Sequence, residues 1–244
     1  MIRAVLTGHS KGLGAGIAEA LLARGVAVMG IARSGAADAK ARHGDLLHEV
    51  ALDLSDLGAA ADWLATPELA RFLKGAETAL LINNSGVVSP IGPAGTQDAM
   101  ETAHAVSLNV AAPIMLAQGF IAASEGIADR RILHVSSGAA RSAIPGWSVY
   151  CATKAALDHH ARTVAADALP GVRITSLAPG VIDTGMQAQI RSTTEDQFAM
   201  RQRFVALKEE GQLASAEACG AKLVAYMLGG RFAADPVTTL SEVA

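Results

Sequence analysis

A tyrosine and a lysine four residues apart, Tyr150 and Lys154, form the pair in this chain best suited to proton chemistry. On a helix this spacing places both side chains on one face, where they can meet the same ligand. A free tyrosine has a pKa near ~10, and a neighbouring ammonium favours the phenolate, so we expect Lys154 to lower the pKa of Tyr150. Tyr150 would then serve as a general acid. Ser137, at the end of an apolar run upstream, is expected to donate a hydrogen bond to the oxygen that Tyr150 protonates.

A glycine-rich stretch near the N-terminus supplies a different kind of site. It follows the first apolar run, precedes a helical pattern, and consists of Thr7-Gly8-His9-Ser10-Lys11-Gly12-Leu13-Gly14. Glycines between a strand and a helix let the main chain approach a pyrophosphate, whose charge the helix N-terminus stabilises. The pattern therefore predicts a dinucleotide site, and a purely structural glycine turn is the alternative.

The residue at the end of the second apolar run distinguishes an NAD site from an NADP site. An NAD site usually has an acidic residue there, whereas an NADP site must hold an extra phosphate. This chain has Arg33 at that point, and Lys11 in the glycine turn adds a positive charge on the same side. Each cation taken alone is typical of a solvated surface, but the two together favour NADP(H).

Two further strand ends are predicted to border this ligand. Asp53 and Leu54 close the third apolar run, where Asp53 either accepts from the adenine amine or caps the helix that follows. Asn83, Asn84 and Gly86 end the fourth run, at the carboxyl edge where ligands bind in open α/β sheets. A turn held by asparagine side chains is the alternative for this second segment.

Positioning these groups requires strands that alternate with helices. Six short apolar runs are expected to be buried strands, namely Ile2 to Leu6, Val26 to Ile31, Leu46 to Leu52, Ala79 to Ile82, Arg131 to Val135, and Arg173 to Leu177. Helical patterns fill the gaps, notably at 13–23, 55–64, 96–122 and 147–169. With Pro236 to Leu240 as a candidate seventh strand, the sequence predicts an α/β fold. It would be a single Rossmann-like domain over residues 1–244, a doubly wound parallel sheet of six to seven strands with helices on both faces.

Composition excludes several function classes. The 244-residue chain has a net charge of −3 without a cluster of basic residues, so nucleic acid is not an expected partner. Cys151 and Cys219 match neither a disulfide framework nor a metal-ligand spacing, and the adjacent His159 and His160 point to different faces, so no metal site is predicted. We find no signal-peptide core and no apolar run of about 18 residues, and expect a cytoplasmic protein without a membrane partner.

Together these motifs resemble the short-chain dehydrogenase/reductase family. The resemblance runs from Thr7 to Thr184, and it includes the glycine turn, the segment 83–86, the Ser137, Tyr150 and Lys154 set, Asn109, and Pro179-Gly180-Val181-Ile182-Asp183-Thr184. It implies that hydride moves between NADP(H) and a carbonyl carbon, and that the enzyme is a homodimer or homotetramer. Lys154 would also hold the nicotinamide ribose, and Asn109 would kink its helix and bind a water that links Lys154 to solvent. Contacts to the carboxamide end of the cofactor would come from Pro179, Gly180, Ile182 and Thr184.

Within that family, the segments Gly146 to Lys154 and Asp183 to Gln187 are most similar to the branch of sepiapterin and benzil reductases. The resemblance implies reduction of vicinal dicarbonyls on flat, ring-bearing substrates. Trp147 and Met186 would line the substrate pocket, although Trp147 is equally suited to anchor the helix start in the core. Residues 183–214 are expected to form a substrate lid, with a structural helical hairpin as the alternative.

The sequence therefore predicts an NADPH-dependent carbonyl reductase that acts on a small-molecule substrate. Its chain lacks a terminal Val-Asp-Gly-Gly and has Ser85 where alanine is usual in the family, which argues against a 3-oxoacyl-thioester reductase. Another carbonyl substrate, such as a linear 3-oxo thioester or a sugar, is an alternative. An NADP-sensing binding protein without chemistry is the alternative from another class, although a sensor has no need of Ser137 and Tyr150 in register.

Overall fold

The computed structural model describes residues 1–243, which contain a seven-stranded parallel sheet with the strand order β3-β2-β1-β4-β5-β6-β7. The strand bounds are β1 (Ile2–Thr7), β2 (Ala27–Ala32), β3 (Leu47–Ala51), β4 (Thr78–Asn83), β5 (Asp129–Val135), β6 (Val172–Ala178) and β7 (Val237–Thr239). The order reverses between β1 and β4, and ligands of open α/β sheets bind at such a switch point. The doubly wound parallel sheet predicted from the sequence is confirmed, including its edge strand.

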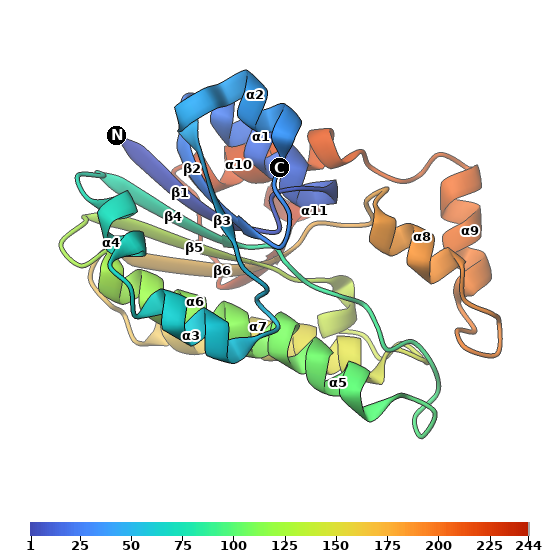
Figure 1. The fold of residues 1–244 in the computed structure, drawn as a ribbon. Coiled ribbons are helices and arrows are strands. Elements are labelled where there is room, and N and C mark those ends of the chain that lie inside the picture. Colours follow the sequence, from blue (N-terminus) through green and yellow to red (C-terminus); the bar gives the residue numbers. More distant parts are fainter. Residues whose placement is uncertain (244) are drawn as a thin grey trace.

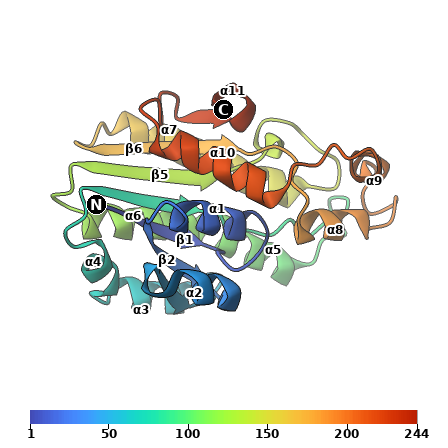
Figure 2. The same ribbon diagram turned by 90° about the horizontal axis from the view of Figure 1, so that it is seen from above.

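Helices cover both faces of the sheet (Figures 1 and 2). One face carries α1 (Gly12–Leu22), α2 (Ala37–His43) and α10 (Ala216–Leu228), and the other carries α3 (Leu57–Leu64), α4 (Glu68–Leu73), α6 (Ala112–Ala123) and α7 (Ser148–Ala166). Side chains alternate between the faces along each strand, so Ala4 and Leu6 of β1 enter one core and Val5 enters the other. Because both faces are buried, the strands read as continuous apolar runs.

Two glycines bring α1 and α10 close together. A Cβ at Gly16 would lie 2.2 Å from the carbonyl oxygen of Ala216, and a Cβ at Gly220 would lie 2.4 Å from the carbonyl carbon of Gly16. Neither contact tolerates a side chain, so the two helix backbones touch. This packing fixes α1 on the sheet and directs its N-terminus, which begins in the glycine turn, at the switch point.

The helix predicted at 96–122 is a continuous helix from Ala99 to Ala123 with three parts, α5 (Ala99–Val106), a π-helical segment (Ser107–Ala111) and α6. An 18-residue window of it has a mean hydropathy of 1.6, which is apolar enough to cross a membrane by length and composition. The window is not an unbroken apolar run, since Ser107 and Asn109 lie within it. In the structure, Ala112, Leu116 and Phe120 of this helix pack into the core on the sheet.

Short helices complete the chain. A 3-10 turn (Gly44–Leu46) precedes β3, another (Gly138–Ala140) follows β5, and α11 (Leu240–Val243) follows β7. Beyond the carboxyl ends of the strands stand α8 (Gly185–Arg191) and α9 (Arg201–Glu209), to the right in Figure 1. They occupy the segment for which a lid or a helical hairpin was expected.

Candidate active site

The structure brings Ser137, Tyr150 and Lys154 together inside the protein. Tyr150 and Lys154 lie on α7 with 7% and 4% of their surfaces exposed, and Ser137 lies just beyond β5, where it hydrogen-bonds to Tyr150. The Nζ of Lys154 lies 5.7 Å from the centroid of the Tyr150 ring and donates to the carbonyl of Val135 at 2.9 Å. The helix spacing and the strand end thus place a phenol, a hydroxyl and an ammonium at one point.

Burial has the largest effect on the pKa of Tyr150 and on the pKa of Lys154. It raises the pKa of Tyr150 to about 12, against the hydrogen bond with Ser137, which lowers it. Burial also lowers the pKa of Lys154 to about 8, against the negative charge of Asp158, which raises it. The expectation that Lys154 lowers the pKa of Tyr150 is therefore wrong here, because the cost of a buried phenolate exceeds any gain from the neighbouring ammonium. The neutral phenol that results is the form that can donate a proton.

Asn109 lies in the π-helical segment and is buried. Its Oδ1 accepts from the main-chain N of Val87 at 2.9 Å, and its Nδ2 donates to the carbonyl of Val87 at 2.8 Å and to Oγ1 of Thr153 at 3.2 Å. A π turn accommodates one residue more than an α turn and reorients the side chains around it. Asn109 therefore ties the loop after β4 to α7, one residue before Lys154.

The glycine turn has the main-chain geometry that an approaching phosphate requires. Gly8 and Gly12 have φ of 69° and 54°, which disfavours other residues. A Cβ at Gly14 would lie 1.9 Å from the carbonyl oxygen of Gly8, so Gly14 has no room for a side chain. The turn exposes main-chain groups at the N-terminus of α1, where an anion is stabilised.

Hydrogen bonds join the glycine turn to the end of β4. Thr7 Oγ1 accepts from the main-chain N of both Asn84 and Ser85 at 2.9 Å, and Asn84 Nδ2 donates to the carbonyl of Thr7 at 3.0 Å. Gly86 follows, where a Cβ would lie 3.1 Å from Asn109 Oδ1 and 3.5 Å from Lys154 Nζ. The two predicted motifs therefore meet at the switch point and continue to Lys154.

The segment 179–184 closes the site from the other side. Ile182 pairs with Ala214 in a parallel bridge, and the Cγ2 of Thr184 would lie 3.4 Å from a Cβ built on Gly12. Thr184 therefore packs against the glycine turn. Pro179 and Gly180, between β6 and this contact, line the same edge of the sheet.

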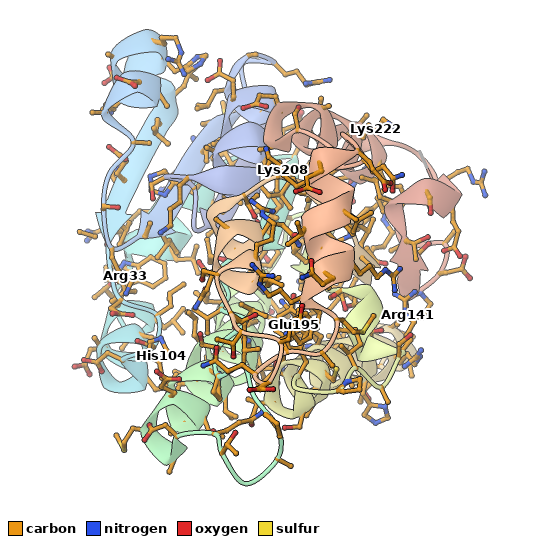
Figure 3. All side chains as sticks on the ribbon, turned by 90° about the vertical axis from the view of Figure 1, so that its right-hand side faces the viewer. Arg33, His104, Arg141, Glu195, Lys208 and Lys222 are labelled. Atoms are coloured by element: carbon orange, nitrogen blue, oxygen red, sulfur yellow. The ribbon has the colours of Figure 1, made fainter. Side chains whose placement is uncertain are left out.

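Arg33 stands directly after β2. Its side chain is 67% exposed, with Nη1 3.9 Å from Oδ2 of Asp53, and Figure 3 shows Arg33 and His104 on the same side of the molecule. The hydroxyls of Ser10 and Ser34 are 3.5 Å apart, so the glycine turn and the residue after Arg33 are neighbours. The guanidinium is therefore solvent-accessible at the edge of the glycine turn and pairs with Asp53.

Asp53 is held by its own turn. Its Oδ1 accepts from the main-chain N and from Oγ of Ser55 at 2.9 and 2.7 Å, and these bonds chiefly lower the pKa of the carboxyl. The cap of α3 is Asp56, whose side chain accepts from the main-chain N of Ala59 at 3.0 Å. Of the two roles expected for Asp53, helix capping is therefore wrong.

Three of the residues predicted to bind the cofactor direct their side chains elsewhere. Leu13 and Leu54 are buried in the cores on the two faces of the sheet. Asn83 is buried and its Nδ2 donates to the carbonyl of Pro113 at 3.2 Å and approaches His134 Nδ1 at 3.1 Å. These residues can meet a ligand through their main chain.

Sequence reasoning missed a histidine inside the glycine turn. His9 is buried, its Nε2 lies 2.9 Å from Oε1 of Glu49 on β3, and the same carboxylate oxygen accepts from the main-chain N of Ala36 at 2.7 Å. A Cβ at Gly30 would lie 2.4 Å from the His9 ring, so this strand position must be glycine. The pair ties the glycine turn to the loop that carries Arg33.

Another pair was also missed. His160 lies 3.0 Å through Nδ1 from Nε2 of the fully buried His134. Within residues 1–243, no group of three or more His, Cys, Asp or Glu side chains is placed to hold a metal ion.

An aromatic cluster lies beside Tyr150. Trp147, 4% exposed, stacks on Phe198 at 4.8 Å between ring centroids and meets the Tyr150 ring edge-on at 5.3 Å. Phe204 of α9 lies 5.4 Å from Trp147, and Met186 of α8 packs against the same cluster. Trp147 thus anchors the start of α7 in this cluster and touches the Tyr150 ring, and a role in lining the substrate pocket stays a prediction. We call Trp147, Phe198 and Phe204 the aromatic cluster.

A hydrogen bond joins the segment 183–214 to the loop after β4, since Gln189 Nε2 donates to Oγ of Ser89 at 2.7 Å. Within the segment, Lys208 of α9 pairs with Asp183. Figure 3 looks onto this segment, with Lys208 and Glu195 labelled on it. A cavity of about 420 Å³ opens nearby and is lined by Val87, Ser89, Met100, Glu101 and His104. Tyr150 is not among its lining residues.

Comparison with known proteins decides the family. The family model of the short chain dehydrogenases matches residues 3–195. The chain belongs to the short-chain dehydrogenase/reductase family. This dehydrogenase is 34% identical over 223 residues to a benzil reductase ((S)-benzoin forming) of Bacillus cereus, covering 87% of this chain and 88% of the relative. It is 33% identical over 237 residues to sepiapterin reductase of Meriones unguiculatus, covering 90% and 88%.

Solved structures of the family agree with this fold. A short-chain dehydrogenase/reductase from Burkholderia vietnamiensis is 46% identical, with a TM-score of 0.73 and coverage of 100% of this chain and 98% of the other. A structure from Beutenbergia cavernae, which is 25% identical with a TM-score of 0.82 over 98% and 94%, holds bound NADP. The family and the branch predicted from the motifs are confirmed. The chain is an oxidoreductase of a family that uses NAD(P)(H).

The site fits such a dinucleotide. Gly8, Gly12 and Gly14 form a cradle that a Cβ would fill, and a Cβ at Gly86 would come within 3.1 Å of Asn109 Oδ1, next to Lys154. The cradle would take the pyrophosphate at the start of α1. Lys154, 3.5 Å from the Cβ position of Gly86, is then placed for the ribose at the reactive end.

Proposed function

We propose that this dehydrogenase is an NADPH-dependent reductase of a ketone in a vicinal dicarbonyl compound. The observation that carries the proposal is the buried Tyr150, in contact with Ser137 on one side and 5.7 Å from Lys154 on the other, at the end of the glycine-lined edge. This arrangement serves proton transfer to an oxygen whose carbon accepts hydride.

Bound NADPH supplies the hydride. Tyr150, kept as a neutral phenol by burial, gives its proton to the carbonyl oxygen as negative charge develops there. Ser137 donates a hydrogen bond to the same oxygen and fixes its position. The ammonium of Lys154, held by the carbonyl of Val135, stabilises the phenolate that remains. Asn109 holds Val87 and Thr153 around this group and supports return of the proton from solvent.

The proposed preference for NADPH over NADH rests on positive charge at the end of β2 and on the absence of an acidic residue there. Arg33 replaces the acidic residue of an NAD site, and Lys11, Ser10 and Ser34 surround the same corner. Arginine binds a phosphate through two parallel N–H groups, which strengthens the contact. Asp53 and the main chains of Leu54, Asn84 and Gly86 border the adenine and ribose. Pro179, Gly180, Ile182 and Thr184 bind the carboxamide end.

The substrate class follows from the aromatic cluster and from the relatives. Trp147 packs edge-on behind Tyr150 and Met186 packs against the same cluster, so an apolar side of the pocket beside Tyr150 would suit an aromatic ring attached to the dicarbonyl. The benzil and sepiapterin reductases that this chain resembles are named for such substrates. Residues 183–214 act as the lid of this pocket within a single domain. We further propose a cytoplasmic homodimer or homotetramer.

The direct test is oxidation of NADPH and of NADH by the purified protein, followed by absorbance, with benzil, sepiapterin and a linear 3-oxo thioester in parallel. NADPH-specific turnover of benzil or sepiapterin is expected. Turnover of the thioester alone would replace the proposed substrate class. Equal rates with NADH would contradict the role of Arg33, and tight NADPH binding without turnover of any carbonyl would favour a binding protein.

A further inference from the structure

A buried carboxylate stands one helical turn beyond Lys154. Asp158 is 2% exposed and lies four residues after Lys154 on α7, so the two side chains share a face of the helix. Burying a charge is costly unless it is paired and hydrogen-bonded. The environment of Asp158 meets that condition, since its partners come from three other segments of the chain.

Both oxygens of Asp158 are occupied by donors. Oδ1 accepts from Oγ of Ser136 at 2.7 Å and from Oγ of Ser176 on β6 at 2.8 Å, and Oδ2 accepts from Nε of Arg141 at 3.1 Å. Arg141 in turn donates through Nη2 to the carbonyl of Thr238 on β7 at 2.9 Å. Figure 3 shows Arg141 on the side of the molecule opposite Arg33. This network is therefore remote from the proposed phosphate site.

Ser136 is the residue before the catalytic Ser137, and Lys154 hydrogen-bonds to Val135 on the same strand end. Asp158 thus holds the strand end that carries Ser137 and the helix that carries Tyr150 and Lys154. We propose that Asp158 is a positioning residue of the active site, which fixes this strand end against α7 and supplies the negative charge that keeps Lys154 an ammonium. This inference rests on the proposed reductase function and adds to it a residue that does not touch substrate or cofactor.

The other groups around Lys154 do not supply that charge. Tyr150 on α7 is neutral, as is His134 on β5, whose pKa burial lowers to about 3, and His160 lies behind His134. Asn109 is uncharged, and Arg141 is a cation that partly offsets Asp158. Among the described residues, Asp158 is the carboxylate whose charge raises the pKa of Lys154 against burial.

Three substitutions separate a charge effect from a structural one. Asp158→Asn removes the charge and keeps the shape, so the midpoint of Lys154 titration should fall by on the order of one pH unit. Arg141→Gln removes the offsetting cation at a partly exposed site, so the midpoint should rise. Ser176→Ala removes one hydrogen bond to the carboxylate and keeps its charge, so the midpoint should stay within a few tenths of a unit of the wild-type value.

The measurement is an NMR titration of the Lys154 ammonium in the cofactor-free protein, with the signal assigned by its loss in Lys154→Arg. The alkaline limb of kcat for NADPH-dependent benzil reduction should move in the same directions, since the reaction requires the ammonium. Unchanged midpoints in Asp158→Asn and Arg141→Gln would overturn the proposal and leave Asp158 a structural residue.

If Asp158→Asn does not fold, Arg141→Gln tests the proposal alone. A Lys154 titration midpoint that falls or stays unchanged in Arg141→Gln contradicts the proposal. If the wild type reduces no dicarbonyl, the substrate assignment fails while the titration still tests Asp158.

Discussion

The glycine turn and the aromatic cluster are held in place by different physical means. In the turn, contacts between main-chain atoms leave no room for a Cβ at Gly14, and Thr7 fixes the turn to β4. In the cluster, Trp147 and Phe198 meet across fifty residues of sequence through their side chains. A region fixed by main-chain contacts tolerates few substitutions, whereas a region built from side-chain packing can be refilled with other side chains. Under the proposed function, the first region binds the cofactor and the second borders the substrate.

The largest expected effect is in the first region, from Gly14→Ala. The new Cβ would overlap the carbonyl of Gly8 and displace the cradle. We expect NADPH binding to weaken about a hundredfold, since overpacking of a tight site costs up to about 3 kcal/mol. Fluorescence titration of NADPH measures this. Gly185→Ala on α8, the helix that packs against the second region through Met186, places a Cβ that meets nothing within 4 Å, so this matched control should bind normally. An equal loss of NADPH affinity in both variants would contradict the proposed difference between the two regions.

A smaller effect is expected from Arg33→Ala, which tests whether side-chain charge adds selectivity to the main-chain cradle. Loss of a charged hydrogen bond to the 2′-phosphate should cost about 2 kcal/mol, or roughly thirtyfold in the Kd for NADPH. The Kd for NADH should hardly change, and it serves as the internal reference. Arg71→Ala on α4 controls for the loss of one surface cation. A parallel loss of both cofactors would refute the phosphate contact.

The smallest effect is expected in the second region, from Phe198→Ala. The ring stacks on Trp147 in a cluster separate from the two cores on the sheet, so we expect KM for an aromatic diketone to rise about fivefold, the equivalent of about 1 kcal/mol for an aromatic pair. Affinity for NADPH should be retained. Phe120→Ala, in a core on the sheet, should instead lower the free energy of unfolding by about 3 to 5 kcal/mol. Thermal unfolding and steady-state kinetics compare the two variants. A loss of stability in Phe198→Ala as large as in Phe120→Ala would contradict the proposal that the aromatic cluster acts on the substrate separately from the cores on the sheet.

The same contrast explains what could be predicted from the sequence. The parallel sheet, the glycine turn and the meeting of Tyr150 with Lys154 depend on periodicity and on local spacing, and the structure confirms them. Phe198 and Phe204 lie in the segment predicted to be a lid, but nothing in the local sequence indicates that they pack against Trp147.

The sequence-based predictions fail for properties that depend on burial or on residues distant in the sequence. The pKa of Tyr150 was expected to fall because the spacing shows Lys154 but not how deeply the phenol lies. Asp158 and His9 are ordinary residues in the sequence, and their partners Ser176 and Glu49 come from strands that only the folded sheet brings near. Long-range packing is not visible in a single sequence, and it therefore limits how much of this site can be predicted from the sequence.

The central claim is that Tyr150 is the proton donor of an NADPH-dependent reductase, and Tyr150→Phe tests it most directly. The account predicts that kcat for benzil reduction falls by about two to four orders of magnitude, the usual share of a general acid, while the Kd for NADPH stays within about twofold. Fluorescence titration of NADPH and stopped-flow reduction would measure the two quantities on the same preparation. A variant that binds NADPH normally and keeps most of its kcat would contradict the account.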